Sequence, residues 1–298
     1  MIIEAHDLRK VYGRSDALRG LTFSVPEGSA FALIGANGAG KTTTIKVLMN
    51  ILTASSGRAS VFGVDSRALS PQEMAQIGYV SENQDMPGRM SVSQYLAYLR
   101  PFYPTWDSSL EKTVLNQLRL PSETKIGHLS HGMRLKLCLA CALPFRPRLL
   151  VLDEPFSGLD PLVRDEFMEG LLGQIGPTTT LIASHELADI EGLVTHVAFL
   201  DAGRLVFQES MDELTGRLRE VRVTLRREAR IPQLLPGTWL QMRAMGCVLS
   251  FVETRFVEGE LQRQIFKAMP GVLDIDVRPI NLRSIFIALA RDAQSRAA

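Results

Sequence analysis

The sequence lacks the features that would place it across a membrane. No apolar run reaches about 18 residues, the length that a membrane-spanning helix needs. The first seven residues include Glu4 and Asp7 and no basic cluster, so they do not resemble a secretory signal peptide. The chain has only 3 cysteines, and so small and odd a number favours a reducing compartment over a disulfide framework. We therefore expect no membrane span in this chain.

The net charge of the chain is close to zero, but the charged residues are unevenly distributed along it. The formal net charge is +1, yet residues 217–298 alone carry 14 Lys and Arg against 8 Asp and Glu. This basic segment could lie near anionic lipid headgroups or an acidic partner surface, or it could be an ordinary solvated face. The 298 residues, 46% of them hydrophobic, suffice for one large domain or two moderate ones, and they contain no internal repeat.

The cysteine pattern does not indicate a metal or redox site. Cys138 and Cys141 form a C-x-x-C motif, but no second cysteine pair supplies further metal ligands. Their neighbours are those of a buried helix: Leu135, Leu137, Leu139, Ala140 and Leu143. We interpret both cysteines as small apolar core residues.

One segment that is present carries a specific chemistry. Residues 35–42 fit the pattern G-x-x-x-x-G-K-[ST], after an apolar run at 30–34 and before a helical pattern at 41–52. A strand, a glycine-rich turn and a helix N-terminus aim several backbone N–H groups at one point, which suits a phosphate. Lys41 can then reach the β- and γ-phosphates, and the Thr42 hydroxyl can hold Mg²⁺. The predicted phosphate-binding residues are Gly35, Ala36, Asn37, Gly38, Ala39, Gly40, Lys41, Thr42 and Thr43.

The order of the remaining patterns predicts an α/β fold. Apolar runs indicate strands at 2–5, 21–25, 59–62, 149–152, 180–183 and 197–200. Three-and-four spacing between 86 and 145 predicts a helical insertion. Beyond 218 the texture changes to a small α+β domain, with strands near 221–225, 247–252 and 272–277 and helices at 260–269 and 282–291. We expect two domains, 1–218 and 219–298.

A second motif narrows the function. The strand at 149–152 ends in Asp153 and Glu154. An acid at a strand end can hold Mg²⁺, which suits Asp153, and the next carboxylate can address a water that attacks the γ-phosphate.

Together with residues 155–160, these motifs resemble the ATP-binding cassette (ABC) ATPases, and the resemblance covers about residues 2–218. The family signature corresponds to residues 129–133, in which Ser130 and Gly132 are retained, and the D-loop corresponds to residues 157–160. The switch histidine matches His185, and the adenine-stacking aromatic matches Tyr12. The resemblance implies a P-loop NTPase core with an N-terminal antiparallel β-subdomain. It implies that Ser130, Gly132 and Asp160 contact ATP in a head-to-tail dimer, and that Glu154 and His185 are catalytic.

Two motifs depart from the family pattern, the signature and the Q-loop. His131 stands where the signature has a glycine, and Met133 stands where it has a glutamine. In the Q-loop, Glu82 replaces the usual glutamine as a candidate metal ligand, whereas Gln84 lies two residues further on. Either residue could serve there, and we favour Glu82. This glutamate and residues 103–107 are similar to a bacterial export-type subgroup.

The resemblance also implies partners. An ABC transporter ATPase without membrane spans pairs with a second ABC ATPase, as a homodimer or heterodimer, and with separate membrane subunits. It would be peripheral on the cytoplasmic face of the membrane. Met86, Met90, Tyr95 and Phe102 would form the docking surface, unless they only fill the helical subdomain. The alternative is a soluble ABC ATPase that acts on ribosomes or DNA. The chain has one cassette and no room for a long coiled coil between Lys41 and Asp153, so we expect no nucleic acid.

Overall fold

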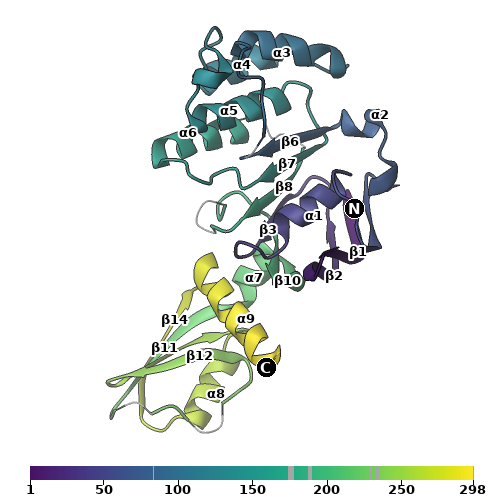
Figure 1. Cartoon of the computed structure of the whole chain (residues 1–298). Helices are drawn as coiled ribbons and strands as arrows, with labels where there is room; N and C mark the ends of the chain where they lie inside the picture. Colours follow the sequence, from purple (N-terminus) through teal and green to yellow (C-terminus); the bar gives the residue numbers. More distant parts are fainter. Residues whose placement is uncertain (83, 174–177, 187–189, 229, 233–234, 298) are drawn as a thin grey trace. The chain divides into compact units, whose positions relative to one another are not determined.

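The computed structural model describes residues 1–82, 84–173, 178–186, 190–228, 230–232 and 235–297 (Figure 1). These residues form two compact units, Met1–Gln208 and Glu209–Ala298. The first unit ends ten residues before 218, the last residue of the predicted first domain. The division assigns the short helix α7 (Met211–Arg217) to the second unit.

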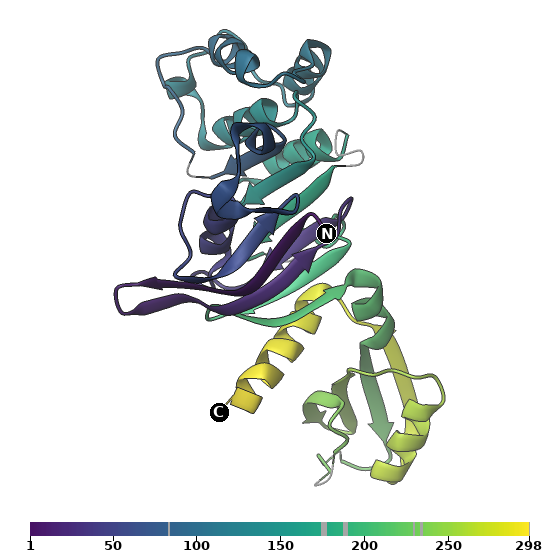
Figure 2. The ribbon, with the colours of Figure 1, turned by 90° about the vertical axis from the view of Figure 1, so that its right-hand side faces the viewer.

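An antiparallel sheet opens the first unit. It contains β1 (Ile3–Tyr12), β2 (Ser15–Val25), β4 (Ser56–Val61) and β5 (Val64–Asp65), in the order β2-β1-β4-β5. β1 and β2 form a long hairpin (Figure 2) that extends well beyond the predicted strands at 2–5 and 21–25. The pairing shifts register after Ala5 and again after Leu8, so polar residues interrupt the alternation in the middle of the hairpin.

A six-stranded sheet of order β10-β9-β3-β8-β7-β6 lies beside it. Its strands are β3 (Ala30–Ile34), β6 (Ile77–Ser81), β7 (Leu149–Asp153), β8 (Thr179–Ser184), β9 (His196–Asp201) and β10 (Arg204–Ser210). Neighbouring strands from β6 through β9 run parallel, which brings their carboxyl ends to one edge of the sheet. The four apolar runs at 30–34, 149–152, 180–183 and 197–200 are all strands, as predicted. β6 and β10 were not predicted, because Gly78 interrupts the first and the second is only half-buried.

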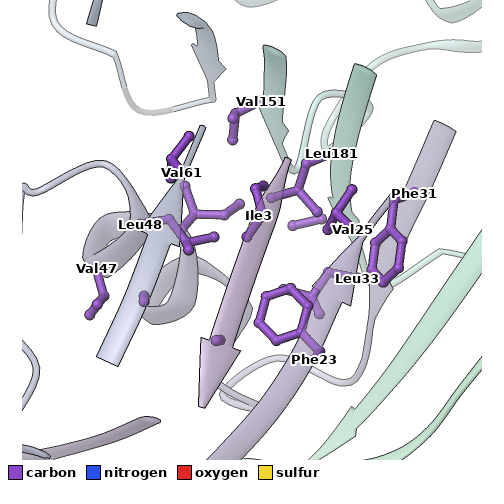
Figure 3. Packing of buried hydrophobic residues seen from close by; sticks show 14 of the residues in the cluster. Ile3, Phe23, Val25, Phe31, Leu33, Val47, Leu48, Val61, Val151 and Leu181 are labelled. Atoms are coloured by element: carbon purple, nitrogen blue, oxygen red, sulfur yellow. The ribbon is translucent and has the colours of Figure 1, made fainter. Parts of the chain in front are cut away.

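Helix α1 (Lys41–Leu48) belongs to the core that joins the two sheets. Figure 3 shows Ile3 and Val61 of the antiparallel sheet, Leu48 of α1, and Val151 and Leu181 of the parallel sheet in one cluster. The helix is shorter than the predicted 41–52. Asn50 adopts a left-handed φ of 55°, and the N–H groups of the next two residues donate to the Lys46 carbonyl, which closes the helix.

The predicted helical insertion at 86–145 is present. It contains α3 (Val92–Leu99), α4 (Ser108–Gln117) and α5 (His131–Ala142), and α6 (Pro161–Leu172) follows β7. A single turn, α2 (Pro71–Met74), precedes β6. In Figure 1, α5 and α6 lie beside β6, β7 and β8, and α3 and α4 lie further from the sheet. α5 contains Cys138 and Cys141, both buried as expected.

The second unit is a four-stranded antiparallel sheet with helices. Its strands are β11 (Arg219–Leu225), β12 (Trp239–Met245), β13 (Val248–Glu253) and β14 (Val272–Pro279), in the order β12-β13-β11-β14. The helices are α7, α8 (Glu260–Ala268) and α9 (Leu282–Ala297). Leu261 and Ile265 of α8 pack on Val221 and Val223 of β11. The edge strand β12 was not predicted, because its second half is exposed and includes Arg243 and Ala244.

None of the helices in the described part of the chain combines the length and the hydropathy that a membrane span needs.

Candidate nucleotide site

The phosphate loop lies where sequence placed it, between β3 and α1. Gly40 precedes the helix with φ 104°, and a Cβ there would lie 2.8 Å from the Ala17 carbonyl oxygen, so only glycine fits. No acidic side chain occupies the first turn of α1, and no side chain caps it. The N–H groups at this helix start are thus available to an anion.

Lys41 is the central cation of the site. Only 5% of its side chain is exposed, and its Nζ donates to the Gly35 carbonyl at 2.8 Å and to the Ala36 carbonyl at 3.3 Å. The same nitrogen lies 3.0 Å from Glu154 Oε1. The lysine therefore joins the phosphate loop to the end of β7.

Asp153 contacts the end of the phosphate loop through Thr42. Its Oδ1 accepts a hydrogen bond of 2.9 Å from the Thr42 hydroxyl. Burial raises the pKa of this carboxyl, and the nearby Glu154 adds to the rise, although the Thr42 hydrogen bond and two lysines oppose it. The buried Asp153 carboxylate and the Thr42 hydroxyl together form a set of oxygen donors. Such a set fits Mg²⁺, whose charge would stabilise the ionised carboxylate.

Glu154 follows the strand end in a left-handed conformation, with φ 53°. Its Oε2 lies 2.7 Å from His185 Nδ1, and Oε1 contacts Lys41, so one carboxylate bridges the phosphate loop and the end of β8. A non-glycine residue in this region is strained, and such strain is concentrated at functional sites. The structure thus brings Lys41, Glu154 and His185 together, although they are far apart in the sequence.

A cavity of about 260 Å³ opens beside Thr42, Asp153 and Glu154. Both Q-loop candidates, Glu82 and Gln84, line it. Gln84 Oε1 is buried and accepts no hydrogen bond from the described residues. Sequence reasoning missed four further lining residues: Lys46, Ile51, Tyr79 and Ser81. Lys46 could have been found from its spacing, one helical turn after Thr42.

The remaining predicted residues do not line this cavity. Ser130 caps α5, where its Oγ accepts from the Met133 N–H at 3.3 Å, and Gly132 is buried in the first turn of that helix. Asp160 caps α6 in the same way, with its carboxylate accepting from the Val163 N–H. Tyr12 lies at the end of β1, 47% exposed, with Lys10 Nζ 5.1 Å from its ring centre.

The geometry defines a class of protein. A glycine-rich loop between a parallel strand and a helix, a buried lysine, and a hydroxyl–carboxylate pair together suit a nucleoside triphosphate with its metal. A second carboxylate held by a histidine suits the activation of a water. This is the arrangement of a P-loop nucleoside triphosphatase.

Comparison with known proteins specifies the family. The ABC transporter family model matches residues 18–157. The bacitracin transport ATP-binding protein BcrA of Bacillus licheniformis is 33% identical over 224 residues, which are 74% of this chain and 73% of the relative. The Nod factor export ATP-binding protein I of Cupriavidus metallidurans is 32% identical over 219 residues, 72% of each chain.

A solved structure agrees. The ATP-binding subunit of an ABC transporter superposes with a TM-score of 0.66 at 28% identity, covering 72% of this chain and 92% of the other. The chain belongs to the ABC transporter family, as its ATP-binding, ATP-hydrolysing subunit. Cassettes of this family dimerise and pair with the membrane components of transporters.

Proposed function

We propose that this protein hydrolyses ATP in a head-to-tail dimer to drive separate membrane subunits of an exporter. The observation that carries the proposal is the cluster at the carboxyl ends of β3, β7 and β8, where Glu154 contacts both Lys41 and His185. Three segments far apart in sequence supply a phosphate ligand, a base and a polar partner for that base.

Each residue has a distinct task in this proposal. The loop residues Gly35–Thr43 bind the phosphates through backbone N–H groups, and Lys41 neutralises their charge once its ion pair with Glu154 opens. Thr42 and Asp153, with Glu82 at the cavity wall, would hold Mg²⁺, which supplies charge neutralisation at the β- and γ-phosphates. Glu154 takes the proton of the attacking water, and His185 holds this carboxylate and senses the γ-phosphate.

The predicted residues outside the cavity support the proposed dimer. Ser130 and Gly132 lie at the start of α5, so this helix N-terminus can face a phosphate from another subunit. Asp160 caps the start of α6 with its own carboxylate, so we propose that it contacts the nucleotide site as part of the D-loop and does not bind a phosphate. A second copy of the chain, or a related ATPase, would contribute these groups. Tyr12, exposed at the end of β1, is available to stack on the adenine.

The membrane partner is supported by a groove in the first unit. Its volume is about 390 Å³, and its walls are largely apolar, with Met49, Met74, Tyr95, Leu99 and Phe145 among them. Ile51 and Phe102 also line it, 58% and 59% exposed. An apolar groove with an exposed aromatic rim suits a helical segment of a partner. Of the predicted docking residues, Tyr95 and Phe102 line this groove.

The direction of transport is supported by relatives whose names refer to export. The Nod factor protein is described as an export protein, and others as drug or antibiotic resistance proteins. We infer an exporter on that basis. Because cassettes of this family pair with membrane components, we also propose that the chain lies on the cytoplasmic face of the membrane.

The variant E154Q tests the hydrolytic part. It should bind ATP but not turn it over, and the mass in solution should show two chains with ATP and Mg²⁺. Normal hydrolysis by E154Q would refute the assigned base.

Co-purification tests the transporter part. A multi-span membrane protein should accompany the tagged chain from solubilised membranes. Co-purification with ribosomes or DNA instead would favour the alternative, a soluble ABC ATPase.

A further inference from the structure

His131 occupies a position that helix formation does not explain. It is the first residue of α5, directly after the capping Ser130. Histidine is a poor helix former, and an imidazolium in the first turn is repelled by the positive end of the helix dipole. Its side chain is 46% exposed, so burial in a core does not explain it either. The reason for this side chain must lie in what it contacts.

His131 contacts the turn that follows the Asp153–Glu154 pair. Its Nε2 lies 3.3 Å from the Ser157 carbonyl oxygen, so the ring can donate a hydrogen bond there when this nitrogen carries the proton. On the other side of the same turn, the Ser157 N–H donates to the Glu154 carbonyl at 3.3 Å. One tight turn thus links the imidazole to the strained residue that carries the proposed base.

One further contact and the packing of the next residue make this placement specific. Glu82 Oε1 lies 3.9 Å from the same nitrogen, within ion-pair distance for a protonated ring. Glu82 also lines the nucleotide cavity, so His131 places the start of α5 next to a wall of that cavity. At Gly132, an added Cβ would lie 2.8 Å from Val163 Cγ1 and 3.3 Å from Leu159 Cδ2. The start of α5 is therefore packed tightly against the segment that follows the turn.

We propose that His131 is a positioning residue that holds the turn carrying Glu154 against the start of α5. His131 does not line the nucleotide cavity of its own subunit. It fixes the base of one nucleotide site relative to the helix that, in the dimer, addresses the other site. The inference rests on the proposed function, because it assigns Glu154 as the base.

Two substitutions in the full chain test the role. H131A removes the donor, and H131Q places an amide N–H at about the distance of Nε2. We expect H131A to lower kcat roughly three- to tenfold, the value of one hydrogen bond. The ATP concentration at half-maximal rate should stay within about twofold, because H131A leaves the phosphate loop, Ser130 and Gly132 unchanged. H131Q should restore at least half of the rate.

The matched control is H128A, which removes an exposed histidine three residues earlier and should leave kcat unchanged. A wild-type kcat in H131A, or a loss in H131Q as large as that in H131A, would overturn the proposal. The melting temperature of each variant is measured in parallel. If H131A melts near the assay temperature, H131Q decides, since a rate near wild type supports the hydrogen bond and a full loss refutes it.

The assay also separates this inference from the proposed function. If E154Q hydrolyses ATP normally, the assigned base is wrong and the role of His131 fails with it. If E154Q is inactive and H131A is normal, only the role of His131 fails.

Discussion

At the scale of single residues, we predict that the buried lysine of the phosphate loop is required for the binding of ATP. Lys41→Ala removes the cation that Glu154 now pairs with and that the phosphates would use. ATP at about 100 times its Kd should raise the melting temperature of the wild type by roughly 5–10 °C. The variant should show almost none of this rise in thermal melts with ATP and Mg²⁺.

Lys112→Ala is the matched control for that experiment. Lys112 is exposed on α4 and has no ion pair among the described residues. It should keep the full ATP-induced rise. A full rise in the Lys41 variant would show that this lysine does not bind the phosphates.

Asp153 should make the stability of the protein depend on pH. Burial raises its pKa above the ordinary 3.8, so the folded protein binds this proton more readily than the unfolded chain. Stability from this group is therefore greatest below pH 3.8 and is lost as pH rises through the raised pKa. At pH 7 the ionised carboxylate costs stability, which Asp153→Asn removes. We expect the nucleotide-free variant to melt roughly 2–4 °C higher at pH 7.

The difference in melting temperature between this variant and the wild type should grow as pH rises from 4 and then level off. Asp165→Asn, at an exposed position on α6, should change nothing. EDTA should reduce the ATP-induced rise of the wild type but not that of the Asp153 variant, because the latter lacks the proposed metal ligand. A lower melting temperature for Asp153→Asn at pH 7 would contradict the account.

At the scale of elements, α5 determines the state of the cysteines. Burial raises the pKa of the Cys138 thiol to about 12 and that of Cys141 well above its ordinary value, so neither forms a thiolate at neutral pH. Cys247, between β12 and β13, is exposed. In the native protein, Ellman's reagent should therefore modify one thiol per chain quickly and the other two only after denaturation. Cys247→Ser should abolish the fast phase, whereas fast modification of two further thiols would support a redox pair in α5.

Local patterns predicted most of the elements. The strand at 30–34 and the strand at 149–152 are continuous apolar runs beside their motifs, so their place in the sheet could be read directly. Elements with mixed faces were missed. β12 is an edge strand with exposed polar residues, and its pairing with β13 is set by contacts rather than by its own pattern. The end of α1 depends on the left-handed Asn50, which apolar periodicity cannot show.

The site was predicted as a list of residues but not as a geometry. Motif spacing predicted Lys41, Thr42, Asp153 and Glu154 as site residues. It did not indicate that Lys41 pairs with Glu154, because this contact depends on how β3 and β7 are placed in the sheet. The contact of His131 with the Ser157 carbonyl likewise joins the first residue of α5 to the turn after β7, two segments that only the tertiary fold brings together. These two contacts therefore could not be predicted from sequence patterns, because they arise from the tertiary fold.

At the scale of the whole molecule, we expect the two units to have different functions. The nucleotide site lies within the first unit, and the second unit has its own sheet and core. We predict that residues 211–298 support association of two chains without nucleotide, whereas ATP joins the first units. A chain that stops at Ser210 keeps β10 complete and should still show the ATP-induced rise in melting temperature.

Light scattering after size exclusion separates the two modes of association. Without nucleotide, the full chain of 33.0 kDa should run as a pair and the truncated chain as a single copy. The truncated chain that carries the E154Q substitution should form a dimer only with ATP and Mg²⁺, because the nucleotide interface remains. If the full and the truncated chain have the same number of chains per particle without nucleotide, the second unit does not hold the subunits together. Its function would then have to be sought in regulation, or in stabilising the first unit.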